Sequence, residues 1–234
     1  MTGQQSSFKE IYRSRGFDYD ALVSREDYQG NILSHIQRIV DLDGIDIVEF
    51  GAGTGRVTKL LASSVRHIVA TDASKHMLAV AHQQLSNTAN IAFVVADSRH
   101  APIADGIADL SIAGWCYGHA TEWHAGDWQA EIGQSLYEMA RVLRPGGTAI
   151  ILETMGTGSE TPAPPNDTLA AYYNWLETEH GFSSAAFRTD YRFDSLDEAD
   201  KLTRFFFGNE LADRVLAENL TTLPECTSIW WKRV

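Results

Sequence analysis

An apolar run that meets an acid and then turns through three glycines has the clearest chemical content of this sequence. Residues 47–56 read Ile-Val-Glu-Phe-Gly-Ala-Gly-Thr-Gly-Arg, with Glu49 two residues ahead of Gly51. A dinucleotide-binding turn needs another glycine five residues after the first, and that position holds Arg56. A carboxylate at Glu49 would repel a pyrophosphate but suits a cationic amino group, and glycines let a ligand lie close to the backbone. The turn therefore favours a ligand with an amino-acid end and a nucleoside end.

Further apolar runs downstream repeat the pattern. Residues 68–71 lead to Asp72, and residues 90–96 lead to Asp97. Residues 108–114 form a fourth run, and an Arg-Pro-Gly-Gly segment at 144–147 leads into a fifth at 148–152. Either acid alone is explained as well by a helix cap as by a ligand site. Their order after the glycine turn favours the ligand site.

This order resembles that of class I S-adenosylmethionine-dependent methyltransferases of the small-molecule type, over residues 45–153. The resemblance implies S-adenosyl-L-methionine as the cofactor, with Asp72 chelating both ribose hydroxyls and Asp97 beside the adenine amino group. The implied cofactor contacts are Glu49, Gly51, Ala52, Gly53, Asp72, Ala73, Met77, Asp97, Ser98, Gly114 and Trp115.

Methyl transfer from a sulfonium depends mainly on an aligned nucleophile, and a base helps where the acceptor must lose a proton. In this family the acceptor lies beyond the fourth strand, where Trp115-Cys116-Tyr117-Gly118-His119 stands in this chain. His119, on the expected loop with Glu122 and His124, is the candidate catalytic base, because histidine titrates near neutrality. The alternative is that it packs or binds substrate. Cys116 lacks the preceding proline of cytosine C5-methylating relatives, which favours a small buried residue over a nucleophile.

Composition narrows the choice of partners. The 234 residues carry a formal net charge of −12, which argues against contact with nucleic-acid phosphates. The Asn/Asp-Pro-Pro-aromatic motif of nucleic-acid amino-methylating relatives is also absent. Two cysteines give neither a disulfide framework nor zinc-ligand spacing, and no metal-ligand pattern is visible. With no apolar signal segment or membrane span, we expect a soluble, cytoplasmic protein.

The spacing of apolar residues predicts the elements that position these groups. It predicts helices from Ser24 to about Val40, after Ser74, and from Trp128 to Leu143. Strands that alternate with helices indicate an α/β fold, a doubly wound, mostly parallel Rossmann-like sheet with helices on both faces. Ligands then bind at the carboxyl ends of the strands, where Glu49, Asp72 and Asp97 fall.

We expect a single domain with three parts: an N-terminal arm and helix at 1–41, a cofactor-binding core at 45–153, and a carboxyl-terminal lid-like extension at 154–234. In the extension the pattern predicts a helix at 168–180, a strand at 186–193, helices around 195–206 and 209–218, and a last strand near 227–231. The extension supplies either a wall of the substrate pocket or packing. The aromatic residues at 169–176 favour packing in the core.

The leading functional interpretation is a methyltransferase that acts on a small molecule, with O-, N- or C-methylation open. A non-catalytic S-adenosylmethionine-binding regulator and a protein methyltransferase remain alternatives, since acidic surfaces attract basic polypeptides.

Overall fold

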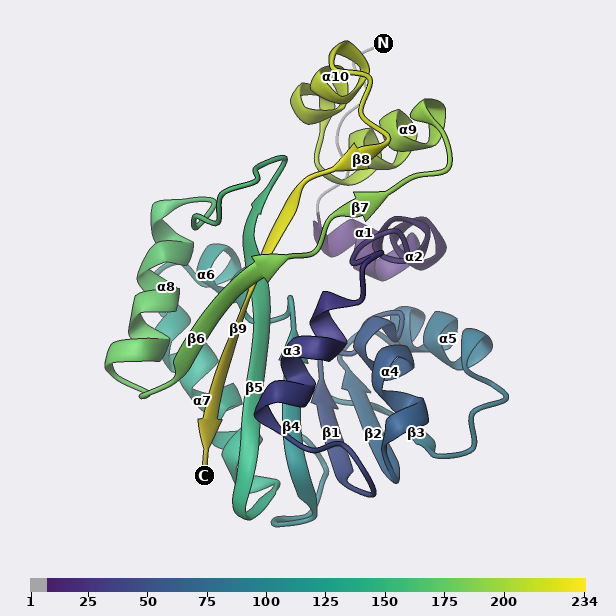
Figure 1. Cartoon of the computed structure of the whole chain (residues 1–234). Coiled ribbons are helices and arrows are strands. Elements are labelled where there is room, and N and C mark those ends of the chain that lie inside the picture. The colour runs from purple at the N-terminus through teal and green to yellow at the C-terminus, as the bar shows by residue number, and fades with distance from the viewer. Residues whose placement is uncertain (1–7) are drawn as a thin grey trace.

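A seven-stranded sheet forms the centre of the molecule (Figure 1). The computed structural model describes residues 8–234. The strand order is β3-β2-β1-β4-β5-β9-β6; β1 to β5 pair in parallel, and β9 pairs antiparallel with β5 and with β6. The bounds are β1 Asp46–Phe50, β2 His67–Asp72, β3 Ile91–Val95, β4 Ala108–Gly114, β5 Leu143–Thr157, β6 Ser183–Arg188 and β9 Glu225–Arg233. The doubly wound, mostly parallel fold predicted from the sequence is confirmed.

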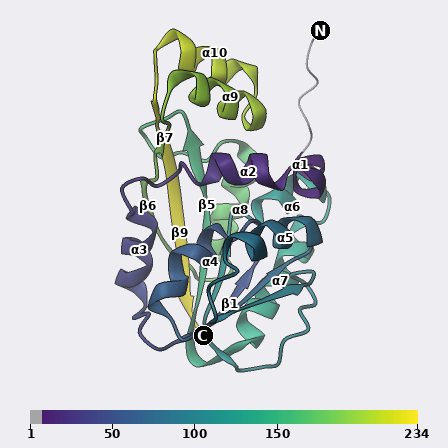
Figure 2. The same cartoon turned by 90° about the vertical axis from the view of Figure 1, so that its right-hand side faces the viewer.

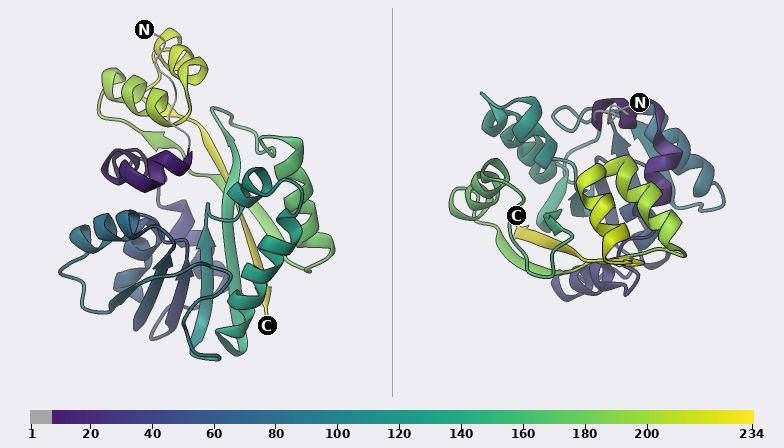
Figure 3. Two further views of the ribbon diagram at one scale, coloured as in Figure 1. Left: turned by 180° about the vertical axis from the view of Figure 1, so that it is seen from behind. Right: turned by 90° about the horizontal axis from the view of Figure 1, so that it is seen from above.

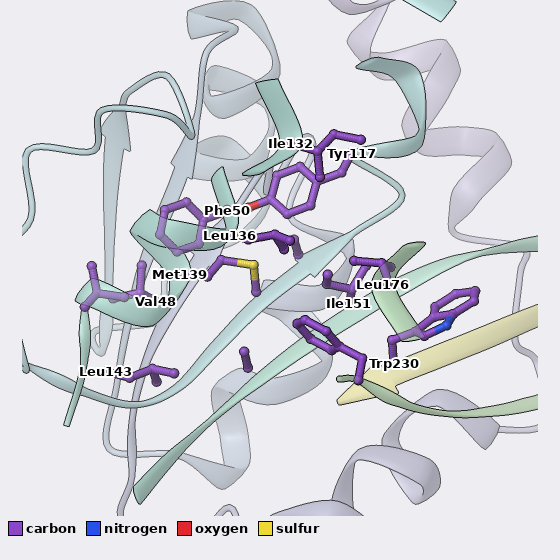
Figure 4. Packing of buried hydrophobic residues seen from close by; sticks show 14 of the residues in the cluster. Val48, Phe50, Tyr117, Ile132, Leu136, Met139, Leu143, Ile151, Leu176 and Trp230 are labelled. Atoms are coloured by element: carbon purple, nitrogen blue, oxygen red, sulfur yellow. The ribbon is translucent and has the colours of Figure 1, made fainter. Parts of the chain in front are cut away.

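Helices cover both faces of this sheet (Figure 2). One face carries α3 Asn31–Ile39, α4 Arg56–Leu61, which continues into a 3-10 turn at Ala62–Ser64, and α5 Lys75–Gln84; the other carries α6 Gly118–Trp123, α7 Trp128–Arg141 and α8 Asp167–Thr178. Along β5, Ile150 and Leu152 pack on the first face, and Ile151 packs on the second. Figure 4 shows the second face, where Met139 of α7 and Trp230 of β9 join its core. Strands buried on both sides explain the continuous apolar runs in the sequence.

A smaller unit stands over the carboxyl ends of the strands, and we call it the cap. It comprises β7 Tyr191–Arg192, α9 Leu196–Phe206, α10 Asn209–Ala217 and β8 Thr222–Leu223. Between the cap and the sheet lie α1 Phe8–Ser14 and α2 Gly16–Val23, which we call the lid (Figure 3). Leu22 of the lid belongs to the apolar cluster of the cap, so the lid and the cap share a core.

Most predicted elements of the extension are confirmed. The helices near 168–180, 195–206 and 209–218 correspond to α8, α9 and α10, and the last strand is β9. The predicted strand at 186–193 is divided, because β6 ends at Arg188 and Tyr191 pairs with Leu223 of the cap. The aromatic residues of α8 are buried in the core, as expected.

Two predicted helix boundaries are wrong. The helix expected from Ser24 begins at Asn31, because the Asp27 carboxylate accepts the N–H groups of Asn31 and Ile32 at 2.8 and 2.9 Å, while Ser24 ends α2. The helix expected to reach Leu143 ends at Arg141, since Leu143 already pairs with Ala108 as part of β5. The start of α5 is as predicted: the Ser74 Oγ accepts the N–H of Met77.

Candidate functional site

A cavity of about 520 Å³ lies at the carboxyl ends of the parallel strands, beneath the lid. Every site residue predicted from the sequence lines it: Glu49, Gly51, Ala52, Gly53, Asp72, Ala73, Met77, Asp97, Ser98, Gly114, Trp115 and His119. The lid adds lining residues that sequence reasoning missed: Lys9, Tyr12, Arg13 and Tyr19. Within the described residues, none from 154–234 lines the cavity. The extension contacts the lid through Phe206 and Phe8, and its predicted role as a lid, a wall of the substrate pocket or packing stays a prediction.

The glycine turn is shaped by close contacts. A Cβ on Gly51 would lie 2.2 Å from the Sγ of Cys116, so this position has no room for a side chain. Gly51 and Gly53 both have positive φ angles, 68° and 56°, which favour glycine. Burial raises the pKa of the Cys116 thiol, which agrees with a packing role for this residue rather than with a nucleophile.

Asp72 holds the turn from the neighbouring strand. Its Oδ2 accepts the N–H of Gly53 at 2.8 Å, and its Oδ1 accepts the N–H of Ser74 at 2.7 Å. Burial raises the pKa of the carboxyl group despite these two bonds. Because each carboxylate oxygen has more than one acceptor site, both can still accept a hydroxyl from a ligand.

Asp97 and Glu49 differ in their electrostatic surroundings. The Arg99 guanidinium pairs with Asp97 and lowers the pKa of that carboxyl to about 2. Burial raises the pKa of Glu49 to about 7, and its Oε2 accepts the Thr58 hydroxyl at 2.5 Å. Asp97 is therefore an ionised acceptor at neutral pH, whereas Glu49 is partly protonated and bonded to α4.

The loop expected for His119, Glu122 and His124 is wrong for the first two residues, which lie on α6, while His124 follows directly after its end. The Nε2 of His119 lies 2.8 Å from the Tyr12 hydroxyl, and its ring stacks on Trp123 with centroids 5.0 Å apart. Burial lowers the pKa of His119 to about 4, so the expected titration near neutrality is wrong. The imidazole is neutral at pH 7, but the Tyr12 hydroxyl occupies its Nε2.

Glu153 fixes the start of α6 and was missed from the sequence. Its Oε1 accepts the N–H of Gly118 at 2.8 Å, so Gly118 belongs to an anchored helix end rather than to a flexible turn. Burial raises the pKa of Glu153 to about 8. The available signal was the pattern of the other strands, because residues 148–152 are also a run that ends at an acid.

The lid is fastened on several sides. The Ser74 hydroxyl donates to the Tyr12 carbonyl at 2.7 Å, and the Gly16 N–H donates to the Nε2 of His76 at 3.1 Å, both on the α5 side. Phe8 packs against Phe206 of the cap, with ring centroids 5.2 Å apart. With the bond from Tyr12 to α6, these contacts hold the lid over the cavity.

A buried ion pair joins the segment that follows the lid to the glycine turn. Arg56 lies 2.9 Å from Glu26, whose side chain is only 1% exposed. The Arg56 guanidinium also lies 3.4 Å from the centre of the Trp115 ring. Trp115 has a positive φ of 50°, which is unusual for a tryptophan. The ion pair of Arg56 and Glu26 therefore packs against a residue of the cavity wall whose backbone is strained.

Comparison with known proteins identifies related sequences. Residues 48–151 match the family model described as a methyltransferase domain. The chain is 32% identical over 115 residues to a demethylmenaquinone methyltransferase of Clavibacter sepedonicus, covering 49% of this chain and 43% of the relative. It is 29% identical over 143 residues to a malonyl-[acyl-carrier protein] O-methyltransferase of Marinomonas sp., covering 58% and 48%. The chain thus spans about half the length of these relatives, or less.

Solved structures share the fold at lower identity. The phosphoethanolamine N-methyltransferase 2 of Haemonchus contortus, solved with phosphomonomethylethanolamine and S-adenosylhomocysteine, matches with a TM-score of 0.61. The match has 15% sequence identity and covers 98% of this chain and 60% of the other. At this identity the likeness concerns the fold alone.

Proposed function

We propose that the chain is an S-adenosylmethionine-dependent methyltransferase of the class I type and that it methylates a small molecule. One observation carries this proposal: the glycine turn and the strand-end acids Asp72 and Asp97 line one cavity.

The residues present fit this cofactor. Asp72 keeps acceptor sites for the ribose hydroxyls, and ionised Asp97 can accept the adenine amino group. A Cβ on Gly53 would lie 3.8 Å from the Met77 side chain and would cover it. Because glycine has no Cβ, this apolar surface stays open to a ligand. When bound, S-adenosylmethionine supplies a methyl group on a sulfonium, and the neutral thioether that is left departs without an acid catalyst.

The chain's own residues then orient the acceptor and exclude water. Tyr12, His119 and Trp123 form a ring wall from the lid and α6 that faces the strand ends. Holding two reactants in line supplies much of the rate of a displacement. Neutral His119 can take a proton from the acceptor at whichever ring nitrogen carries the lone pair; at Nε2 the acceptor would have to replace the Tyr12 hydroxyl.

The lid favours a small acceptor over a polymer. It crosses the cavity and is fastened to α5, α6 and the cap, so it covers part of the opening. The net charge of −12 also disfavours nucleic acid. No observation favours the regulatory or protein-methylating alternatives.

Methyl-labelled S-adenosylmethionine tests this proposal directly. The protein is incubated with the label and with separate small-molecule, protein and nucleic-acid fractions of a cell extract. We expect label to enter the small-molecule fraction only. Label in the protein fraction would support the protein methyltransferase instead, and cofactor binding without transfer to any fraction would support the regulator.

A further inference from the structure

Both tryptophans that line the cavity already hold a cation of the protein. Arg56 lies 3.4 Å from the ring centre of Trp115, and the Lys9 ammonium lies 5.0 Å from that of Trp123. A cation within about 6 Å of a ring centre is attracted by the negative face of the ring. A second cation on the same ring would meet repulsion from the first. Neither tryptophan is therefore free to hold an ammonium group of the acceptor.

The carboxyl groups of the cavity wall are likewise engaged. Arg99 pairs with both Asp97 and Glu131. Asp72 accepts two backbone N–H groups, and Glu49 accepts the Thr58 hydroxyl. Each of these groups already has a donor that the fold holds in place, so part of its negative charge is compensated before an acceptor binds.

Two cations of the lid face the same cavity without a carboxylate partner. Lys9 and Arg13 lie one helical turn apart on α1 and both line the cavity, and within residues 8–234 neither pairs with an acid. The protein as a whole is acidic, with 31 Asp and Glu against 19 Lys and Arg. Two unpaired cations at the cavity thus run against the composition of the chain.

We propose, resting on the methyltransferase function above, that the acceptor carries an anionic group, a carboxylate or a phosphate, which Lys9 and Arg13 recognise. The orientation of α1 supports an acceptor rather than the cofactor as the bound anion. The carbonyl of Tyr12 meets Ser74, close to the predicted ribose site, while Lys9 lies one turn earlier over Trp123 of α6. Lys9 therefore lies beside α6, and none of the predicted cofactor residues belongs to this helix.

Three probes of one shape test the charge preference. 4-Hydroxybenzoate, 4-hydroxybenzamide and 4-hydroxybenzamidine carry an anionic, a neutral and a cationic planar group on the same ring. Each is titrated into the protein saturated with S-adenosylhomocysteine, with tryptophan fluorescence and calorimetry as readouts. We expect the benzoate to bind roughly tenfold or more tighter than the amidine, as charge-assisted hydrogen bonds exceed neutral ones. Phenyl phosphate, titrated alongside, ranks phosphate against carboxylate.

Variants assign the preference to the lid. The double variant Lys9→Gln/Arg13→Gln should bind the benzoate and the amide about equally, while Lys201→Gln, an exposed lysine of α9 outside the cavity, should keep the wild-type ranking. Equal affinity of the wild type for all three probes, tighter binding of the amidine, or no measurable binding of the benzoate would overturn the proposal.

The cofactor serves as the second arm. S-adenosylhomocysteine has a carboxylate, and 5′-methylthioadenosine lacks it. We expect the double variant to bind both as the wild type does. Weaker binding of S-adenosylhomocysteine alone would show that the two cations hold the cofactor, which overturns the acceptor assignment and leaves the methyltransferase function standing. Failure of the wild type to bind S-adenosylhomocysteine would instead defeat the proposed function itself.

Discussion

Asp72 serves the glycine turn as well as the predicted ligand, because each of its oxygens accepts a backbone N–H. Replacing Asp72 with Ala removes these bonds together with the acceptor for the ribose hydroxyls. We expect the affinity for S-adenosylhomocysteine to fall by about 1.5–3 kcal/mol, the range for hydrogen bonds to a charged group. Calorimetry on the folded variant measures this loss, with Asp41→Ala, an exposed acid outside the cavity, as the control. Unchanged affinity would remove Asp72 from the cofactor site.

His119 differs from a typical catalytic histidine, since burial lowers its pKa to about 4. If it is the base, turnover depends on its neutral form, which persists as pH rises and is lost only as pH falls through about 4. We expect a flat turnover profile between pH 6 and 8, and a loss of roughly 10²–10⁴ in turnover for His119→Ala with unchanged cofactor affinity. Full turnover in the variant with a raised Michaelis constant would indicate that His119 binds the acceptor instead.

At the scale of elements, the ion pair of Glu26 and Arg56 joins the segment directly after the lid to the glycine turn. Glu26→Ala leaves a buried guanidinium without its partner, which costs about 3–5 kcal/mol in the free energy of unfolding. Asp18→Ala breaks the exposed pair with Arg15 and should cost less than about 1 kcal/mol. Urea unfolding of both variants checks the contrast. Equal, small losses would mean that the lid is not braced by this pair.

The sequence reveals the strand ends better than the lid, for a physical reason. Asp72 and Asp97 each close a continuous apolar run, so their position follows from local pattern and from the geometry of parallel strands. Tyr12 meets His119 across 107 residues, and no local pattern encodes that contact. The low pKa of His119 follows from the same packing, so the local sequence pattern does not predict it either. The local pattern placed Glu26 at the start of a helix. Its buried ion pair was not predicted, because its partner, Arg56, belongs to another element.

For the whole molecule, buried carboxyl groups set an unusual dependence of stability on pH. Burial raises the pKa of Glu153 and of Glu225 from 4.5 to about 8. Between these pH values the folded protein binds more protons than the unfolded chain, so the free energy of unfolding falls as pH rises. We expect Tm to decline from pH 5 to pH 8. The lowered pKa of Asp97, about 2, acts only below about pH 4.

Glu153→Gln tests this assignment, because an amide stays neutral at every pH. The decline in Tm should become shallower, by several degrees over the window, since about 1 kcal/mol shifts Tm by about 2–4 °C at this size. Glu160→Gln, an exposed acid of the loop after β5, should leave the slope unchanged. Thermal unfolding followed by circular dichroism measures both, and an unaltered slope in Glu153→Gln would show that Glu153 titrates normally.

The overall charge leads to a further expectation for the whole molecule. With a net charge of −12, non-specific binding to nucleic acid should be negligible at physiological salt. Gel retardation with duplex and single-stranded oligonucleotides checks this, at low salt and at physiological salt. Salt-sensitive retardation together with label transfer from the cofactor to the oligonucleotide would contradict both this prediction and the small-molecule acceptor.

None of the helices in residues 8–234 has the length and apolar character of a membrane span.

The position of β9 in the sheet has a consequence for protein synthesis. β9 lies between β5 and β6, yet the ribosome makes it last among the strands of the sheet. At about 5–20 residues per second, synthesis of β6 is complete a few seconds before synthesis of β9, its neighbour in the sheet. During that interval the outer edge of β5 is an unpaired template on a nascent chain, which can pair with the chain on an adjacent ribosome. Slow decoding of residues 189–233 would lengthen this exposure, so codon choice in that segment should influence the yield of folded protein.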